Sequence, residues 1–523
     1  MSAAGRERWG LSRLTALAAG LLQAAAIAWP GSGQALGSLQ VFSLWVLCLG
    51  LVRMVEHEAS PRQMAGRAAM QAFCFALTWL TGSFWWLFVS MHDVGGLPAP
   101  LAAAAVLALA AALALYYAAM AAVWASLVAR TGGLSRPWHA SVLFAALWLL
   151  AELMRGRWFT GFPWGAGGYA HVDSWLASLA PWVGVYGVGA VAAALAMRLA
   201  LGVARWQAWR DTAAVLALCA GLQAWGPAFT ASAGAGQVEL LQASIAQSVK
   251  FNPLEGVRDA LSWYDQRLRQ STQPLVVAPE TAIPLLPRYL PEGYWSGLRA
   301  ALAGRSDRLA LVGVPWGDAT QGYTNAVVAM GPAGRPDYRY DKFHLVPFGE
   351  FVPSGFRWFV DRLQIPLSDF TRGAADQPAV EWQGQRLALN ICYEDLFGEE
   401  LAARFRVQDR APTALVNVSN IGWFGNTIAV DQHLSISRMR ALELQRPMLR
   451  ATNTGATAII DHQGRVQGML ARFTRGSLVG PYEGRTGLTP FARWAADWGV
   501  WPLWCLALWV VGQAWFAGRR RAR

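Results

Sequence analysis

Residues 387–397 read Leu-Ala-Leu-Asn-Ile-Cys-Tyr-Glu-Asp-Leu-Phe, a mostly apolar run that leads into a cysteine and two acidic residues. The apolar run is typical of a buried β-strand, and the acidic residues favour the start of a helix directly after it. Backbone N–H groups at a helix start stabilise a thiolate, so Cys392 is a candidate nucleophile. The alternative is that Cys392 is a small buried hydrophobic residue without chemistry.

Short strands alternate with helical segments on both sides of this stretch, from residue 234 to residue 487. This alternation predicts a layered α/β domain. We expect its strands at 238–245, 275–279, 309–315, 326–330, 387–392 and 414–419. We expect its helices at 253–269, 293–303, 398–406 and 430–444.

A second stretch, residues 276–284, reads Val-Val-Ala-Pro-Glu-Thr-Ala-Ile-Pro and ends a buried-looking strand on a carboxylate. A carboxylate at the apolar end of a strand tends to have a raised pKa, which suits proton transfer near neutral pH. Glu280 is therefore a candidate general base. An ordinary strand-end acid or a helix cap is the alternative interpretation.

A third stretch, residues 340–353, reads Tyr-Asp-Lys-Phe-His-Leu-Val-Pro-Phe-Gly-Glu-Phe-Val-Pro and places one lysine among aromatic and apolar residues. A fixed ammonium can stabilise an oxyanion where charge develops, and loss of one such donor typically costs about 3–4 kcal/mol. Lys342 is a candidate for this part, and a surface lysine on a loop is the alternative.

The cysteines and histidines argue against disulfides and metal. Of five cysteines, only Cys392 lies in the α/β region, so no disulfide framework is possible there. The histidines of this region are scattered and show no metal-ligand spacing. We therefore expect no metal and no cofactor.

The rest of the chain has the composition of a membrane protein, because 54% of all residues are hydrophobic and only 15% are charged. A membrane-spanning helix needs about 20 mostly apolar residues. Eight such spans are expected, at 14–31, 35–54, 69–91, 98–129, 138–154, 174–203, 212–230 and 492–517. Basic residues before the first span leave a cleaved signal peptide as an alternative to an anchor.

Arginines alternate between the connections of these spans, which sets an orientation. Arg53, Arg130, Arg198 and Arg519 fall on one side, which the positive-inside rule makes cytoplasmic together with both chain ends. The α/β domain then lies outside the cytoplasm, in the periplasm, and much of the net charge of +12 reflects topology and not nucleic-acid binding.

Two arginines depart from this pattern. Arg155 and Arg157 follow the fifth span on the outer side. Arginine commonly binds phosphate, so we expect both to meet a lipid phosphate.

Glu280, Lys342 and Cys392, in this chain order and each at a strand end, resemble the nitrilase or carbon-nitrogen hydrolase superfamily. The eight spans and the motifs Phe-Thr-Gly-Phe-Pro-Trp at 159–164 and Arg-Ala-Thr-Asn-Thr-Gly at 450–455 resemble its apolipoprotein N-acyltransferase branch. The resemblance implies a nitrilase-like α-β-β-α sandwich inserted between helices 7 and 8 of an all-α membrane domain. The expected boundaries are 1–233, 234–487 and 488–523.

The resemblance implies an N-acyltransferase of the bacterial inner membrane. Cys392 would take an acyl chain from a phospholipid donor as a thioester and pass it to the amino terminus of a diacylglyceryl-cysteine lipoprotein, with ping-pong kinetics. Glu280 would move protons, and Lys342 would stabilise the oxyanion. The chain is expected to act as a monomer.

Matching motifs extend the expected site to residues that support the pocket or bind substrate: Glu350, Tyr393, Glu394, Phe251 and Trp423. The N–H of Tyr393 is a candidate oxyanion donor, whereas a core aromatic and a helix-start acid are the alternatives for Tyr393 and Glu394. Two positions depart from the family pattern, since Phe251 stands in place of Trp and Ile421 in place of Asp.

Two rival functions remain. A membrane-anchored amidase would share this site and let water resolve the thioester, so only an acylated amine product separates it from a transferase. A transporter should carry ionisable residues inside its spans, and Glu152 is nearly the only one.

Overall fold

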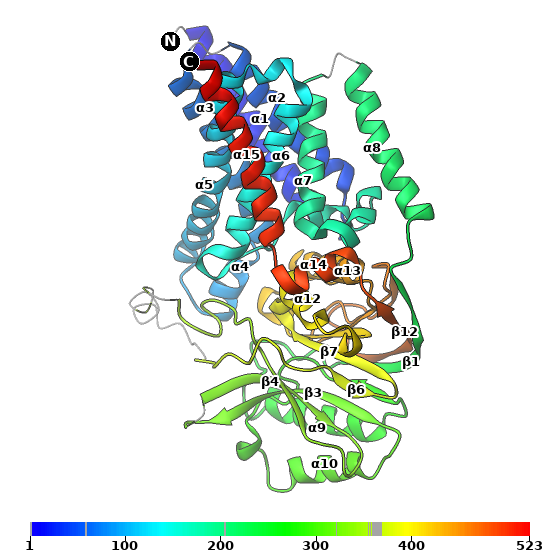
Figure 1. Cartoon of the computed structure of the whole chain (residues 1–523). Helices are drawn as coiled ribbons and strands as arrows, with labels where there is room; N and C mark the ends of the chain where they lie inside the picture. Colours follow the sequence, from blue (N-terminus) through cyan, green and yellow to red (C-terminus); the bar gives the residue numbers. More distant parts are fainter. Residues whose placement is uncertain are drawn as a thin grey trace. The chain divides into compact units, whose positions relative to one another are not determined.

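The computed structural model describes residues 3–57, 60–202, 206–320, 322–353, 355, 357 and 369–522. The chain forms two compact units (Figure 1). One contains Met1–Phe88, Pro98–Pro227 and Val500–Arg523, and the other contains Val89–Leu97 and Ala228–Gly499.

The first unit is helical, as its apolar composition predicts. Its helices are α1 (Ala3–Ile27), α2 (Gly37–His57), α3 (Pro61–Phe84), α5 (Ala99–Thr131), α6 (Pro137–Arg157), α7 (Ala180–Ala200), α8 (Trp206–Trp225) and α15 (Trp501–Ala522), and α4 (Leu87–Val89) leads out of it. Buried aromatic rings join three of them, since Trp79 and Trp148 stack at 5.6 Å and Tyr117 lies 5.0 Å from each ring.

Within the described residues, four helices are long and apolar enough to cross a membrane, or up to six if each pair of helices divided by a short break counts as one span. Three of the expected spans are wrong in detail. Span 69–91 crosses the break between α3 and α4. Span 212–230 is too long, because α8 ends at Trp225 and a strand begins at Thr230. Span 492–517 is two helices, α14 (Pro490–Trp498) and α15, because Gly499 takes a positive φ of 54° that ends α14.

Arg155 does not have the role that its position suggested. Its side chain is buried and donates to Glu152, to the Tyr117 hydroxyl and to the carbonyl oxygens of Phe162 and Trp164. The expectation that Arg155 binds a lipid phosphate is therefore wrong, because these partners already occupy its guanidinium. Arg157 is exposed, and its role stays a prediction.

The second unit contains two six-stranded mixed sheets. The first has the order β12 (Gly476–Gly487), β1 (Thr230–Gln242), β2 (Leu275–Val277), β3 (Leu309–Asp318), β4 (Gly322–Met330) and β5 (Tyr338–Asp341). The second has the order β11 (Val466–Met469), β10 (Ala458–Ile460), β9 (Met448–Thr452), β8 (Ala414–Ser419), β7 (Gln385–Ile391) and β6 (Val380–Trp382). The six expected strands are all present, five of them within four residues at their ends, whereas β1 begins eight residues before the expected start at 238.

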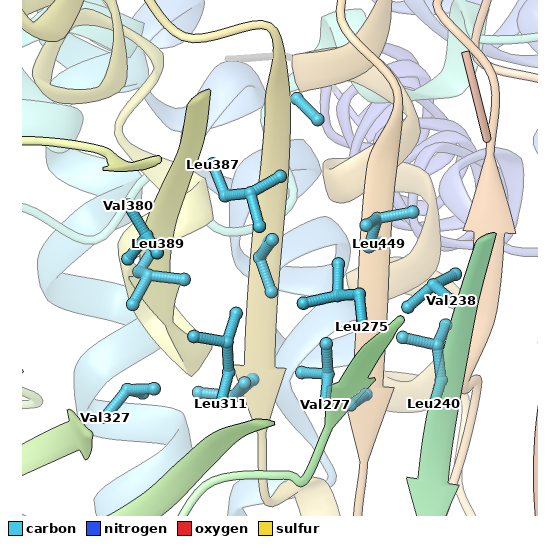
Figure 2. Packing of buried hydrophobic residues seen from close by; sticks show 14 of the residues in the cluster. Val238, Leu240, Leu275, Val277, Leu311, Val327, Val380, Leu387, Leu389 and Leu449 are labelled. Atoms are coloured by element: carbon cyan, nitrogen blue, oxygen red, sulfur yellow. The ribbon is translucent and has the colours of Figure 1, made fainter. Parts of the chain in front are cut away.

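Alternating side chains build the layers of this unit. Leu309 and Leu311 of β3 belong to the same buried cluster as Leu387 and Leu389 of β7. Figure 2 shows Leu311, Leu387 and Leu389 in this cluster. The intervening residues of β3 face α9 (Gly256–Gln270) and α10 (Tyr294–Ala303) on the outer side.

The second sheet has its own helical layer. Ala388 of β7 and Leu415 of β8 pack against α12 (Gly398–Ala402), α13 (Ala429–Leu444) and α14. The unit is therefore a helix, sheet, sheet, helix sandwich, and the period-two alternation of buried strands accounts for it.

Candidate active site

Cys392 lies at the carboxyl end of β7, where the chain turns into a short 3₁₀ helix, Cys392–Leu396. Its φ of 54° is in the left-handed region, which is unusual for a residue with a Cβ and turns the side chain out of the strand direction. The Ser419 hydroxyl, at the end of the neighbouring parallel strand β8, donates to the sulfur at 3.4 Å. The turn therefore presents the thiol at the edge where parallel strands end.

Glu280 lies in the turn after β2, and three distant segments hold its carboxylate. Asn325 of β4 donates an amide N–H to Oε1 at 2.7 Å, and the backbone N–H of Asn420 donates to Oε2 at 2.8 Å. Lys342 lies 3.4 Å from Oε1. Burial alone would raise the pKa of Glu280, but Lys342, Asn325 and Lys250 outweigh it and hold the pKa below its usual value. The expected raised pKa is thus wrong in direction.

Lys342 lies directly after β5 and contacts two carboxylates. Its ammonium is 2.9 Å from Glu350 as well as 3.4 Å from Glu280, and the three side chains are almost fully buried. Burial alone would lower the pKa of Lys342, but Glu350 and Glu280 raise it above its usual value. Asn325 bridges the carboxylates by donating to both. A fixed, permanently charged ammonium results.

The thiol of Cys392 is neutral at rest. Burial and the negative charge of Glu280 raise its pKa to about 12, against the opposing effect of Lys342. Glu280 is ionised under the same conditions. The site therefore pairs a protonated nucleophile with an ionised proton acceptor and a cation, which is the arrangement that attack on a carbonyl carbon needs.

Glu394 joins the two loops that carry Lys342 and Cys392. Its carboxylate accepts from the backbone N–H of Ile391 at 2.6 Å, Phe343 at 2.7 Å and His344 at 3.1 Å, and from the Tyr340 hydroxyl. Glu394 is buried. These hydrogen bonds hold the two loops together, and the part of Glu394 as a support of the pocket stays a prediction.

The aromatic residues of the expected site differ in exposure. Tyr393 is buried and packs against the rings of His344 and Phe397. Phe251 and Trp423 are 50% and 38% exposed, so they offer apolar surface. Ile421, the departure from the family pattern, is buried and takes no polar part.

Three site residues were missed by sequence reasoning: Asn325, Ser419 and Asn420. Asn420 directly follows β8 and Asn325 directly precedes the apolar run 326–330 of β4, so polar residues next to the apolar runs of strands were the available signal. Among the described residues, no group of three or more His, Cys, Asp or Glu side chains could hold a metal ion.

Comparison with known proteins identifies the family. Residues 19–198 match the apolipoprotein N-acyltransferase N-terminal domain, and residues 231–483 match carbon-nitrogen hydrolase. The chain is 53% identical to the apolipoprotein N-acyltransferase of Verminephrobacter eiseniae, over 93% of this chain and 92% of that protein. The chain belongs to the apolipoprotein N-acyltransferase family.

A second member of the apolipoprotein N-acyltransferase family, from Ralstonia nicotianae, is 46% identical over 87% of this chain and 85% of its own length. The C. elegans NitFhit protein is a solved structure similar to 48% of this chain, with 62% of its own chain covered, 17% identity and a TM-score of 0.36. The chain is an acyltransferase of the nitrilase superfamily with several apolar helices, and its relatives do not favour the amidase alternative.

Proposed function

We propose that Cys392 carries the acyl chain in apolipoprotein N-acyl transfer, from a phospholipid donor to the α-amino group of the N-terminal S-diacylglyceryl-cysteine of a lipoprotein. The observation that carries this proposal is the neutral Cys392 thiol beside an ionised Glu280 and a fixed Lys342 ammonium. The names of the relatives supply the reaction.

In the first half-reaction the thiol proton of Cys392 moves to Glu280 while the sulfur attacks the ester carbonyl carbon of the phospholipid. Lys342 and the N–H of Tyr393 stabilise the oxyanion. When the carbon–oxygen bond breaks, Glu280 returns the proton to the leaving lysophospholipid oxygen. A thioester and an ionised Glu280 remain.

In the second half-reaction the neutral amine of the lipoprotein attacks the thioester carbonyl carbon. Glu280 accepts a proton from the amine, an amide forms, and the sulfur leaves and regains that proton. The lysophospholipid leaves before the acceptor reacts, so the kinetics are ping-pong.

The remaining expected residues support or line this site. Glu350 holds the Lys342 ammonium, and Glu394 fixes the loops around it. Phe251 and Trp423 offer exposed aromatic surface for the apolar part of a substrate. One copy of the chain suffices, because Glu280, Lys342 and Cys392 come from the same unit.

The chain is a bacterial inner-membrane protein by its apolar helices and its bacterial relatives. We infer that eight helices cross the membrane, that they belong to the first unit, with α15 as the last of them, and that the second unit lies in the periplasm. Both chain ends are then cytoplasmic. The alternation of arginines in the connections supports this orientation.

Intact mass after incubation with phospholipid alone tests the proposal. The wild-type chain should gain the mass of a fatty acyl group, and hydroxylamine should remove it because thioesters react with it. Cys392→Ala should gain nothing. Cys505→Ala is the matched control, since it removes an exposed cysteine of α15 and should keep the adduct.

Folded wild-type protein that gains no adduct from varied phospholipids would contradict the proposal. Where the adduct does form, addition of a diacylglyceryl lipopeptide should transfer the acyl group from the protein to the amine of the lipopeptide. Release of free fatty acid with no acylated amine would support the amidase instead.

A further inference from the structure

The chain contains only two lysines, Lys250 and Lys342, among 44 basic residues of the Lys and Arg type. Both are almost fully buried, at 2% and 1% exposed, and both lie within hydrogen-bond distance of Glu280. Every other basic position carries Arg. Both ammonium groups therefore contact Glu280, Lys250 at its backbone carbonyl oxygen and Lys342 at its carboxylate.

Lys250 holds the turn that carries Glu280. Its ammonium donates to the Thr281 hydroxyl at 2.6 Å and to the carbonyl oxygen of Glu280 at 3.2 Å. Thr281 has a φ of 48°, in the left-handed region that a β-branched residue rarely adopts. Such a conformation persists only where the surroundings hold it. The two hydrogen bonds from Lys250 to Thr281 and Glu280 are contacts that hold this conformation.

The type of residue matters at this position. A guanidinium is planar and spreads its charge over a fork, whereas an ammonium is a compact point charge with donors that rotate. Lys250 uses these donors to reach one hydroxyl and one carbonyl oxygen on adjacent residues.

We propose that Lys250 is a positioning residue for Glu280, whose hydrogen bonds fix the Glu280–Thr281 turn and whose positive charge keeps the Glu280 carboxylate ionised. This inference rests on the proposed function, in which Glu280 is the proton acceptor for Cys392. The hydrogen bonds of Lys250 go to the carbonyl oxygen of Glu280 and to the Thr281 hydroxyl, so Lys250 acts through Glu280.

The hydrogen bonds of Lys250 and its positive charge can be distinguished by their dependence on pH. The titratable groups that face Lys250 are Glu280, in the turn after β2, and Cys392, at the end of β7. Burial lowers the pKa of Lys250 to about 7, against the opposing effect of both groups. A neutral amine keeps two N–H groups for its two acceptors, so the turn stays fixed above pH 7. The positive charge of Lys250 acts only below about pH 7, which is the range in which Glu280 titrates.

Rates of thioester formation between pH 4 and pH 8 test the two contributions. Lys250→Met should slow the reaction roughly tenfold at all pH values, because the turn loosens. It should also move the acid limb upward by about one pH unit, because Glu280 loses a neighbouring cation. Thr281→Val is the matched variant that removes the hydroxyl and keeps the charge, so it should slow the reaction without moving the limb.

An acid limb that stays in place in Lys250→Met overturns the electrostatic part, and an unchanged rate in both variants overturns the positioning part. Thermal unfolding of each variant in detergent verifies that the protein is folded.

A second measurement needs no acyl transfer and no variant of Lys250. Labelling with [ε-¹³C]lysine gives only two side-chain signals, because the chain has two lysines. The Lys250 signal should titrate near pH 7, and Glu280→Gln should lower its midpoint by about one unit because a facing carboxylate is lost. A Lys250 signal that titrates near 10.5 or ignores Glu280→Gln overturns the inference, whereas failure of the proposed function appears separately as a missing acyl adduct.

Discussion

The carbonyl oxygen of Cys392 accepts two hydrogen bonds from beneath the site, from Asn417 Nδ2 at 3.2 Å and His433 Nε2 at 3.3 Å. Arg450 donates to His433 Nδ1 at 2.9 Å, and because arginine cannot accept, Nδ1 is unprotonated and Nε2 carries the hydrogen. The same Nε2–H points at Asp395 at 2.9 Å. A neutral histidine of fixed tautomer thus holds the left-handed turn at Cys392.

Protonation of His433 should loosen this turn. Burial and Arg450 lower the pKa of His433, so the folded state favours the neutral ring. The neutral ring of His433 therefore contributes its full stabilisation above pH 6.5, the ordinary pKa of histidine. This stabilisation is lost as the pH falls below 6.5. Between pH 6.5 and pH 5, the melting temperature of the wild type should fall more steeply than that of His433→Gln. Parallel curves would show that His433 does not couple to folding.

At the scale of elements, one arginine links the end of α6 to the segment that follows it. Arg155 pairs with Glu152 at 2.9 Å and donates to the carbonyl oxygens of Phe162 at 2.9 Å and Trp164 at 2.7 Å. The segment 158–166 has little regular structure of its own, so these bonds supply partners for backbone groups inside a helical unit.

Replacement of Arg155 by Ala should destabilise the helical unit by about 3–5 kcal/mol, because Glu152 is left buried without its partner. Arg157→Ala is the matched control two residues away, and as an exposed position it should change stability by less than about 0.5 kcal/mol. Thermal unfolding in detergent measures both. Equal shifts for the two variants would mean that the buried pair contributes nothing specific.

Local sequence predicted the elements better than their partners. Leu309 and Leu311 alternate with smaller apolar residues, and this local pattern is enough to predict β3. The partners of Glu280 could not be predicted, because Asn325 and Asn420 lie 45 and 140 residues away and meet it only when the two sheets form and pack together. The predicted direction of the Glu280 pKa shift was wrong for the same reason, because the lysines that lower this pKa come from distant segments. The break at Gly499 was missed because apolar residues of α14 are followed directly by the apolar run of α15.

For the whole molecule, chain order and charge give the same orientation. The start of α1 and the end of α15 lie at the same end of the helical unit (Figure 1). A chain that crosses the membrane an even number of times has both ends on the same side, and the inferred number of crossings, eight, is even. The arginines of the connections support the proposal that this end is cytoplasmic.

Cysteine labelling with an impermeant maleimide tests this orientation in intact cells. Glu292→Cys lies on the exposed surface of the α/β unit and should react directly. Ser135→Cys, exposed between α5 and α6, should react only after the membrane is permeabilised. The unaltered chain gives the background from its native cysteines. The reverse labelling pattern would exclude a periplasmic α/β unit.

The high pKa of Cys392 also bears on how long the enzyme stays active. Oxidants attack thiolates far faster than thiols, and a sulfenic acid is rescued most readily by a second thiol nearby. Residues 234–487 contain no other cysteine, so the protein carries no resolving thiol there. With its pKa raised to about 12, the resting sulfur is almost entirely protonated and so is a poor target for peroxide. In the proposed periplasmic location, resistance of the thiol to oxidation thus follows from the same electrostatics that keep it protonated before an ester binds.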